Sequence, residues 1–270
     1  MALVPRPSFK TLFTDAAQQD RNRAAAGMFL SSGDATVAEI AAGADMDYLL
    51  IDAEHSPLSL ESVQAQLRVI AGYSSIPVVR VPENDSRIIK QFLDLGAQSL
   101  IIPMIFTPED AAKAAAAVAY PSEGTRGIGS ALARSGAWGR YPEYLTTARD
   151  TITLIIQIET AEAVEHIDDI LAIEGIDGIF IGPSDLSASM GYLGQQNHPD
   201  VVKAAKDVIA KATAAGKIAG VNAFNPDQAA DYVAAGADFV NVGADVALLA
   251  RATEQLAAKW TSTETETTSY

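Results

Sequence analysis

Eight short apolar runs alternate with helix-like segments along almost the whole chain, and this alternation constrains the fold more than any other feature. The runs occupy residues 27–30, 48–51, 77–81, 99–104, 153–158, 178–181, 218–221 and 239–242. They do not alternate between apolar and polar residues, as strands with one solvent-exposed face do. Continuous apolar runs are typical of strands that are buried in a parallel sheet. Eight strand–helix units in about 250 residues predict an α/β fold, a closed (β/α)8 barrel.

The segments between the runs carry the start and stop signals of helices. Asn225-Pro226 places a capping side chain before a proline in the first turn. Gly43, Gly96 and Gly236 stand where helices should end, each just before an apolar run. We expect helices over residues 35–42, 60–71, 87–95, 108–120, 161–171, 201–214, 226–234 and 246–260.

A doubly wound open sheet is the alternative architecture. That fold usually has a glycine-rich fingerprint directly after its first strand. Here the first run is followed by Ser31-Ser32-Gly33-Asp34, which is not such a fingerprint. No linker divides the chain. We therefore expect one barrel domain over residues 1–260, followed by a disordered polar tail, TSTETETTSY, at residues 261–270.

Composition narrows the classes of function. Asp and Glu number 34 against 19 Lys and Arg, which gives a formal charge of −15 and disfavours nucleic acid or an anionic membrane as a partner. The absence of cysteine excludes disulfides, Cys–Zn sites, Fe–S clusters and thiol catalysis. No apolar run is long enough to cross a membrane, and residues 1–20 do not resemble a signal peptide. We expect a cytoplasmic protein that acts on small molecules.

Polar side chains follow the carboxyl ends of several runs. In a (β/α)8 barrel these ends meet at one face, where the chemistry gathers. No lysine stands there, since Lys217 opens the seventh run, and this disfavours imine catalysis. The loops after the last two runs lack a glycine-rich cradle, which disfavours a phosphorylated substrate. The side chains at or just after these ends are Asp52, Glu54, His55, Arg80, Gln157, Glu159, Ser184, Asp185, Asn222 and Asp245.

Two carboxylates and one histidine are the first candidates for chemistry. Glu159 and Asp185 follow neighbouring strands, and their oxygens suit a hard divalent cation, but each could instead cap the helix that follows. His55 comes three residues after Asp52, as a general base oriented by a carboxylate would. It could also be a polar loop residue before Pro57, and the sequence leaves both interpretations open.

Arg80 is the candidate cation of the site. It lies near the end of the third run, at the mouth of the predicted barrel, and this position favours a functional role over the alternative of an ion pair with Glu83 or Asp85. Three other polar residues are interpreted as helix caps or solvent-facing side chains: His166, His198 and Asp245.

Several motifs together resemble one known family. They are LLIDAEHSP (49–57), PVVRVPEND (77–85), LIIPM (100–104), TRGIGSALA (125–133), IQIET (156–160) and GIFIGPSDLSASMG (178–191). Their sequence and order are similar to those of the HpcH/HpaI family of class II pyruvate-dependent aldolases, from about residue 29 to residue 249. The resemblance implies cleavage and formation of 4-hydroxy-2-oxo acids from pyruvate, or a close 2-oxo acid, and an aldehyde.

The resemblance also implies roles for individual residues. Glu159 and Asp185 would bind a divalent cation, Mg²⁺, Mn²⁺ or Co²⁺, with no organic cofactor. His55 would be the general base, with Asp52 as its partner, and Arg80 would stabilise the enolate. Substrate contacts would come from Arg80 and from three further residues, Gln157, Ser184 through its backbone, and Asp185.

Assembly and specificity are implied less directly. Asp94, which alone would be a helix-face carboxylate, matches an aspartate that raises the basicity of the histidine across a subunit boundary. A homo-hexamer is expected, with the apolar helix at 246–260 packed on a neighbour. Phe29 stands where tryptophan is frequent and Asn222 where some relatives have an apolar residue, so the aldehyde specificity stays open.

Two other functions remain as alternatives. One is a lyase of the related citrate lyase or malyl-CoA lyase type, although no basic patch for the CoA phosphates is apparent. The other is a non-catalytic barrel that binds a 2-oxo acid. The complete set of histidine, arginine, glutamate and aspartate disfavours a barrel without catalysis.

Overall fold

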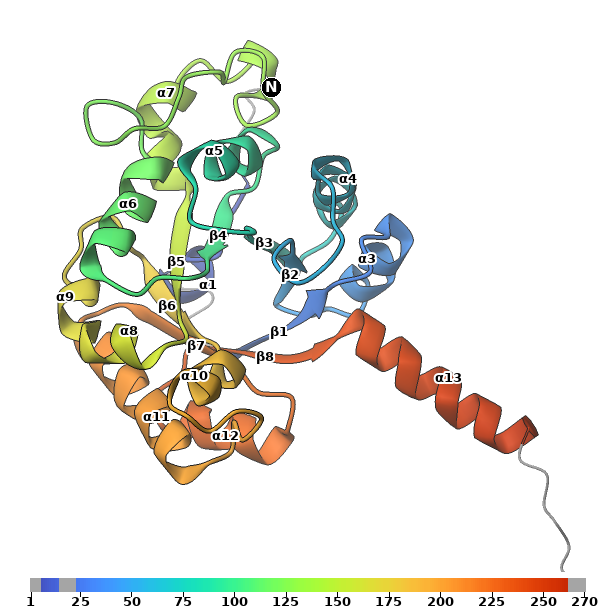
Figure 1. Cartoon of the computed structure of the whole chain (residues 1–270). Coiled ribbons are helices and arrows are strands. Elements are labelled where there is room, and N and C mark those ends of the chain that lie inside the picture. Colours follow the sequence, from blue (N-terminus) through green and yellow to red (C-terminus); the bar gives the residue numbers. More distant parts are fainter. Residues whose placement is uncertain (1–5, 15–22, 262–270) are drawn as a thin grey trace, which may run out of the picture.

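The eight apolar runs form the eight parallel strands of one closed barrel. The computed structural model describes residues 6–14 and 23–261. Each strand pairs with the next along the chain and the last pairs with the first, which confirms the predicted (β/α)8 fold (Figure 1). The strands are β1 (Ala25–Leu30), β2 (Tyr48–Asp52), β3 (Ile76–Arg80), β4 (Ser99–Ile102), β5 (Thr153–Ile158), β6 (Gly178–Ile181), β7 (Ile218–Asn222) and β8 (Phe239–Ala244).

One strand is shorter than its apolar run, for a local reason. The run continues to residue 104, but β4 ends at Ile102 because Pro103 has no N–H to donate to the ladder. The next backbone N–H, that of Met104, donates instead to the Glu159 carboxylate at 2.8 Å. The end of this strand therefore already contributes to the candidate site.

Helices cover the outside of the barrel between successive strands (Figure 1). Their N-caps agree with the sequence signals: Asn225 accepts from the first turn of its helix, and His198 caps the longest covering helix. The predicted helix at 161–171 is interrupted at His166, whose φ and ψ of −93° and 8° leave the helical range. The helices are α1 (Thr11–Thr14), α3 (Ala35–Ala42), α4 (Leu60–Ile70), α5 (Ser86–Asp94), α6 (Pro108–Val118), α7 (Tyr144–Thr147), α8 (Ala161–Glu165), α9 (Ile167–Leu171), α10 (Pro183–Ser189), α11 (Pro199–Ala214), α12 (Pro226–Ala234) and α13 (Asp245–Thr261), with short 3-10 turns at Ala137–Gly139 and Ala148–Thr151.

Aromatic side chains fill the amino-terminal half of the barrel. Phe9, from the segment before β1, packs edge-on against Tyr48 and Phe239 with ring centroids 5.0 and 4.9 Å away. Gly220 makes room for this packing, because a Cβ there would lie 2.1 Å from the Phe239 ring. The backbone N–H of Phe9 also donates to Ser99 at 2.9 Å. The barrel is thus closed at this end, and a ligand can enter only from the carboxyl ends of the strands.

The last helix, α13, does not cover the barrel as the others do. It projects away from the body of the molecule (Figure 1). Its first residue, Asp245, is buried and accepts hydrogen bonds from the backbone N–H groups of Ser31 and Ser32 at 2.8 and 3.1 Å. Beyond this anchor its large apolar side chains are exposed: Val246, Leu248, Leu249, Leu256 and Trp260.

Two predictions concern the ends of the chain. The predicted tail, apart from Thr261 at the end of α13, and most of residues 1–20 lie outside the described residues. Among the helices of the described ranges, none has the length and apolar character needed to span a membrane.

Candidate active site

A cavity of about 240 Å³ opens at the carboxyl ends of the strands. Most of the site residues predicted from the sequence lie in or beside this cavity, although they are far apart along the chain. Asp52 and Glu159 lie beside the cavity and contact its lining residues Arg80 and Gln157, whereas Asp94 is elsewhere. The cavity is lined by Phe29, His55, Arg80, Gln157, Phe180, Gly182, Pro183, Ser184, Asp185 and Asn222.

Arg80 is the buried cation of the cavity, with 7% of its surface exposed. Asp52, its register partner on β2, accepts a hydrogen bond from Nε at 2.9 Å, and its second carboxylate oxygen lies 2.9 Å from Nη2. Its Nη1 lies 3.1 Å from Glu54 and 3.3 Å from the Gln157 side-chain oxygen. The suggested pairing with Asp85 is wrong, because that carboxylate caps α5. The guanidinium is therefore held rigidly at the floor of the cavity.

Asp52 fixes the loop that carries His55. Its Oδ1 accepts from the backbone N–H groups of Glu54 and His55 at 3.2 and 3.4 Å. The imidazole itself is 62% exposed, and its Nε2 lies 3.7 Å from the Glu54 carboxylate. Asp52 thus positions the histidine through the main chain, and the carboxylate next to the ring is Glu54.

Glu54 is the residue to which the sequence analysis gave no role. Its side chain is 10% exposed and contacts both Arg80 and His55. Burial, opposed by Arg80 and reinforced by the nearby carboxylates Glu159, Asp52 and Asp185, raises the pKa of Glu54 to about 7. Its place between two functional residues at a strand end was the available signal.

Glu159 lies beside the cavity and does not cap the helix after β5. Thr160 caps α8 instead, because its hydroxyl accepts from the N–H of Ala163. The Glu159 carboxylate is 2% exposed and accepts from Met104 N–H and from the Gln157 amide. The helix-cap interpretation of Glu159 is therefore wrong.

Asp185 is in the first turn of α10, whose N-cap position is Gly182 without a capping side chain. Asp185 is exposed to the cavity, as an incoming ligand would require. The neighbouring Ser184 hydroxyl donates to Gln196 at 2.9 Å, which leaves its backbone as the part available to a substrate. Glu159 and Asp185 together offer an all-oxygen donor set for a divalent cation.

Asp94 does not reach the cavity of its own chain. It ends α5, at the amino-terminal end of the barrel, and pairs at 3.0 Å with Arg126, whose side chain is fully buried. Arg126 also donates to Tyr144 at 3.1 Å and lies over the Tyr120 ring, 4.6 Å from its centroid. Any action of Asp94 on a histidine would require a second copy of the chain, and this stays a prediction.

Comparison with known proteins identifies a family. Residues 25–252 match the family model described as HpcH/HpaI aldolase/citrate lyase. The chain belongs to the HpcH/HpaI aldolase/citrate lyase family. This confirms the resemblance that the sequence motifs indicated, and it covers all eight strands.

Similar members of the HpcH/HpaI family carry aldolase names. The hydroxypyruvate/pyruvate aldolase of Deinococcus radiodurans is 48% identical over 234 residues, which are 87% of this chain and 84% of that protein. The 4-hydroxy-2-oxo-heptane-1,7-dioate aldolase of Salmonella typhimurium is 47% identical over 251 residues, covering 93% and 95%. A solved family member from Burkholderia cenocepacia has a TM-score of 0.85 at 40% identity and covers 91% of this chain and 98% of its own.

Proposed function

We propose that this protein is a class II pyruvate aldolase that cleaves, and in reverse forms, 4-hydroxy-2-oxo acids. The products would be pyruvate, or a close 2-oxo acid, and an aldehyde. The observation that carries the proposal is the cavity itself, where one rigidly held guanidinium faces an excess of carboxylates and an accessible imidazole. The aldolase names of relatives that are 47% and 48% identical over most of the chain support the same reaction class.

Arg80 supplies a fixed positive charge to the anion that develops when the C3–C4 bond breaks. Its bidentate pair with Asp52 holds the guanidinium in place before substrate arrives, so no reorganisation accompanies the reaction. Gln157 donates to Glu159 and accepts from Arg80, which keeps all three side chains in one orientation. The substrate carboxylate and 2-oxo oxygen would bind between Arg80 and the backbone of Ser184.

The charge balance of the cavity fits a bound divalent cation. Four carboxylates, Asp52, Glu54, Glu159 and Asp185, lie close enough to interact, against the single cation Arg80. Glu159 and Asp185 would hold Mg²⁺, Mn²⁺ or Co²⁺ through oxygen atoms alone, with no organic cofactor. Such an ion acts as a Lewis acid that lowers the energy of a pyruvate enolate.

His55 would move the proton of the C4 hydroxyl. The exposed imidazole takes this proton as the aldehyde departs and returns it in the addition direction. Glu54, 3.7 Å from Nε2, stabilises the protonated ring when its own carboxyl group is ionised. Phe29 and Asn222, which line the cavity from β1 and β7, would contact the aldehyde part of the substrate.

We propose a homo-hexameric assembly in the cytoplasm. The exposed apolar side chains along α13, among them Leu249 and Leu256, support packing on a neighbouring subunit. Asp94 could act on a histidine only across such a subunit boundary. A sequence without cysteine and with a charge of −15 is consistent with a reducing compartment and a small-molecule substrate.

Pyruvate release tests the function directly. The purified chain is incubated with 4-hydroxy-2-oxoheptanedioate, with EDTA or with Mg²⁺, and pyruvate is measured with lactate dehydrogenase. Cleavage that needs the metal and is lost in Arg80→Met supports the proposal. Malyl-CoA serves as the alternative substrate. Carbon–carbon cleavage of malyl-CoA but not of the 2-oxo acid identifies the acyl-CoA lyase, and no turnover of either compound identifies a binding barrel.

A further inference from the structure

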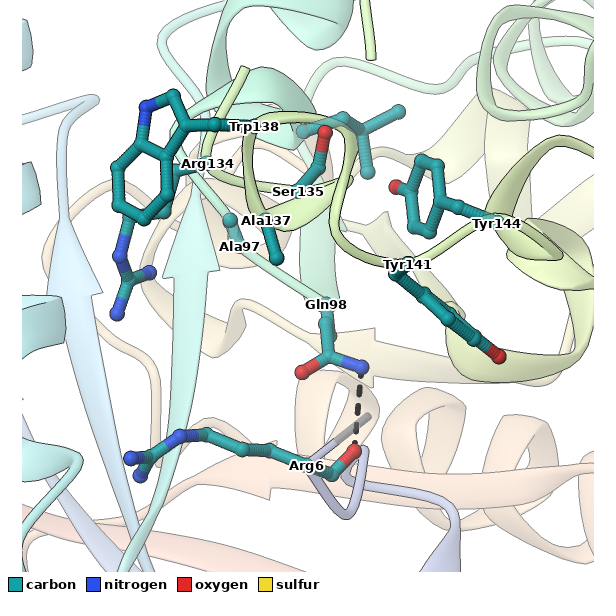
Figure 2. A pocket seen from close by; sticks show the side chains of 11 residues that line it. Arg6, Ala97, Gln98, Arg134, Ser135, Ala137, Trp138, Tyr141 and Tyr144 are labelled. Carbon is teal, nitrogen blue, oxygen red and sulfur yellow. Dashed lines mark hydrogen bonds between the residues drawn. The ribbon is translucent and has the colours of Figure 1, made fainter. Parts of the chain in front are cut away.

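Figure 2 shows a second pocket, of about 390 Å³. Its lining residues lie at the amino-terminal ends of the strands, opposite the active-site cavity. Ala97 and Gln98, which immediately precede β4, form part of its wall. Arg6 contributes from the segment that closes the barrel, and residues 134–144 contribute from the long loop between α6 and β5. The packed aromatic interior of the barrel separates this pocket from Arg80, so a molecule bound here does not occupy the substrate site.

Two arginines line this pocket and a third lies near them. Arg134 and Arg6 line it, and Arg68, in the last turn of α4, lies close enough to repel Arg134. Across the described ranges 6–14 and 23–261, none of these three side chains forms an ion pair. Burial first, and then the charges of Arg6 and Arg68, lower the pKa of Arg134. In a chain with 34 acidic residues, such a cluster is stabilised when an anion binds to it.

The position of Arg134 is set by the backbone beneath it. Gly96, with φ of +94°, ends α5, and a Cβ there would lie 2.5 Å from Nη1 of Arg134. The same nitrogen donates to the carbonyl oxygen of Leu95 at 3.1 Å, so the guanidinium complements the end of this helix. That bond uses one of five N–H donors. The remaining donors are held in place beside the pocket.

Three aromatic side chains form a further part of the wall. In Figure 2, Tyr141 and Tyr144 lie across the pocket from Trp138 and Arg134. The Ser135 hydroxyl lies in the same lining, and its oxygen is buried without a hydrogen-bond partner. Aromatic faces can stack on a flat ring, whereas guanidinium groups and a free hydroxyl can donate hydrogen bonds to an anionic group. The volume is within the range of pockets that hold small organic ligands.

We propose that this pocket is a second binding site of the protein, for a small organic anion that carries a flat ring and a phosphate or carboxylate group. The helix-end role of Arg134 accounts for one hydrogen bond only. Arg6 likewise donates to the carbonyl oxygen of Ala71, at the end of α4. These two backbone bonds do not explain why the positive charges lie together, nor the unpaired Ser135 hydroxyl. A ligand here would also touch Tyr144, which is hydrogen-bonded to Arg126 and through it reaches Asp94.

Trp138 provides a direct measurement of binding. The sequence has two tryptophans, so Trp260→Phe leaves Trp138, at the pocket, as the sole indole. This variant is titrated with AMP, which has a ring and a phosphate, and with 4-hydroxybenzoate, which has a ring and a carboxylate. Adenosine has the ring of AMP without its phosphate, and inorganic phosphate has the anion without the ring. We expect a saturable fluorescence change with at least one ring-bearing anion and a weaker response to either half alone.

Matched variants assign the signal to this pocket. Arg134→Met should weaken binding by about tenfold or more, the usual effect of losing a charge-assisted hydrogen bond. Arg134→Lys, which keeps the charge, should retain part of the binding affinity. Arg140→Met is the control: Arg140 lies 5.7 Å from the Trp138 ring but does not line the pocket. If a melting curve shows that Arg134→Met is unfolded, Arg6→Met replaces it.

Three outcomes would overturn the proposal. The first is that neither ring-bearing anion gives a saturable signal. The second is that Arg80→Met abolishes binding while Arg134→Met does not, which would place the anion in the active-site cavity. The third is that no probe binds and Arg134→Met reduces the assembly mass measured by light scattering. The arginines would then form ion pairs with acidic residues of a second copy of the chain and would not bind a small ligand.

Discussion

Asp52 and Arg80 lie opposite one another on the paired strands β2 and β3, and their side chains meet in a hydrogen bond from Nε and an ion-pair contact from Nη2, each of 2.9 Å. The parallel register of the strands brings the two charges to the floor of the active-site cavity. Asp52 also accepts from the backbone N–H of His55. One carboxylate therefore holds both the cation and the loop of the proposed base.

The shape of this ion pair makes Arg80 difficult to replace by lysine. Arg80→Lys keeps the positive charge but cannot contact Asp52 at two points, so the charge no longer has a fixed position. We expect kcat/KM for aldol cleavage to fall by about 10²–10³-fold, as for the loss of one donor to a developing anion. Arg87→Lys, at an exposed arginine paired with Asp85, is the control and should be close to wild type. A fully active Arg80→Lys enzyme would contradict the proposed role.

His55→Ala separates a general base from a structural loop residue. A positioned base typically contributes about 10²–10⁴-fold, so kcat should fall by that factor while Tm and metal affinity stay nearly unchanged. The measurement is kcat and Tm on one purified preparation. His166→Ala, between α8 and α9, is the matched control. A metal-loaded, stable His55→Ala enzyme with near-normal cleavage would remove the residue from the mechanism.

Glu54 should give the metal-free protein a specific pH dependence. Its ordinary pKa of 4.5 is raised to about 7 in the folded chain. As pH rises, the unfolded chain loses this proton first, so this carboxyl group stabilises the fold at low pH and ceases to do so as pH passes about 7. In EDTA, the free energy of unfolding of the wild type should therefore fall between pH 4.5 and about pH 7. Glu54→Gln should reduce this fall.

Urea unfolding at several pH values measures the Glu54 effect. Glu165→Gln, at an exposed position on α8, is the control and should leave the pH profile unchanged. Adding Mg²⁺ should shift the wild-type profile to lower pH, because a cation stabilises the ionised carboxylate. The same slope in the wild type and in Glu54→Gln would show that this carboxyl group titrates as an ordinary glutamate.

Metal removal tests the role of Glu159 and Asp185. We expect EDTA to abolish cleavage and Mg²⁺, Mn²⁺ or Co²⁺ to restore it. Glu159→Gln keeps the side-chain shape but removes a charged ligand, so the metal concentration needed for half-maximal activity should rise by about tenfold or more. Full activity in EDTA, together with inactivation by borohydride and pyruvate, would indicate an imine mechanism instead.

The exposed face of α13 predicts the effect of a single charge on assembly. Leu249→Arg places a charge on the apolar surface without changing the cavity, so light scattering should show a smaller species than the wild type. Glu254→Arg, at an exposed acidic residue of the same helix, is the control. An active wild-type monomer at micromolar concentration would contradict both the hexamer and the role of Asp94 across subunits.

The barrel could be predicted from the sequence because its signals are local. Each strand is an apolar run and each helix has its own start and stop residues, so the order of elements follows without any contact map. Even the discrepancy at β4 had a local cause in Pro103. The break at His166 had no comparable signal, since histidine is an ordinary helix residue.

The candidate site was predictable in its members but not in its contacts. Because all parallel strands end at one face, the positions of Arg80, Gln157 and Glu159 at strand ends correctly predicted that they are neighbours. Which carboxylate pairs with which cation depends on register and rotamer. For this reason Asp52 was assigned to the imidazole, whereas its side chain contacts Arg80 and the backbone of His55.

Asp245 joins two parts of the molecule that the sequence separates by more than two hundred residues. It begins α13 and also receives the N–H groups of Ser31 and Ser32, two residues beyond Phe29 in the cavity wall. In the proposed assembly, a rotation of this helix would move the part of the wall that we propose contacts the aldehyde. By thermodynamic linkage, acceptor binding and subunit association would then influence one another.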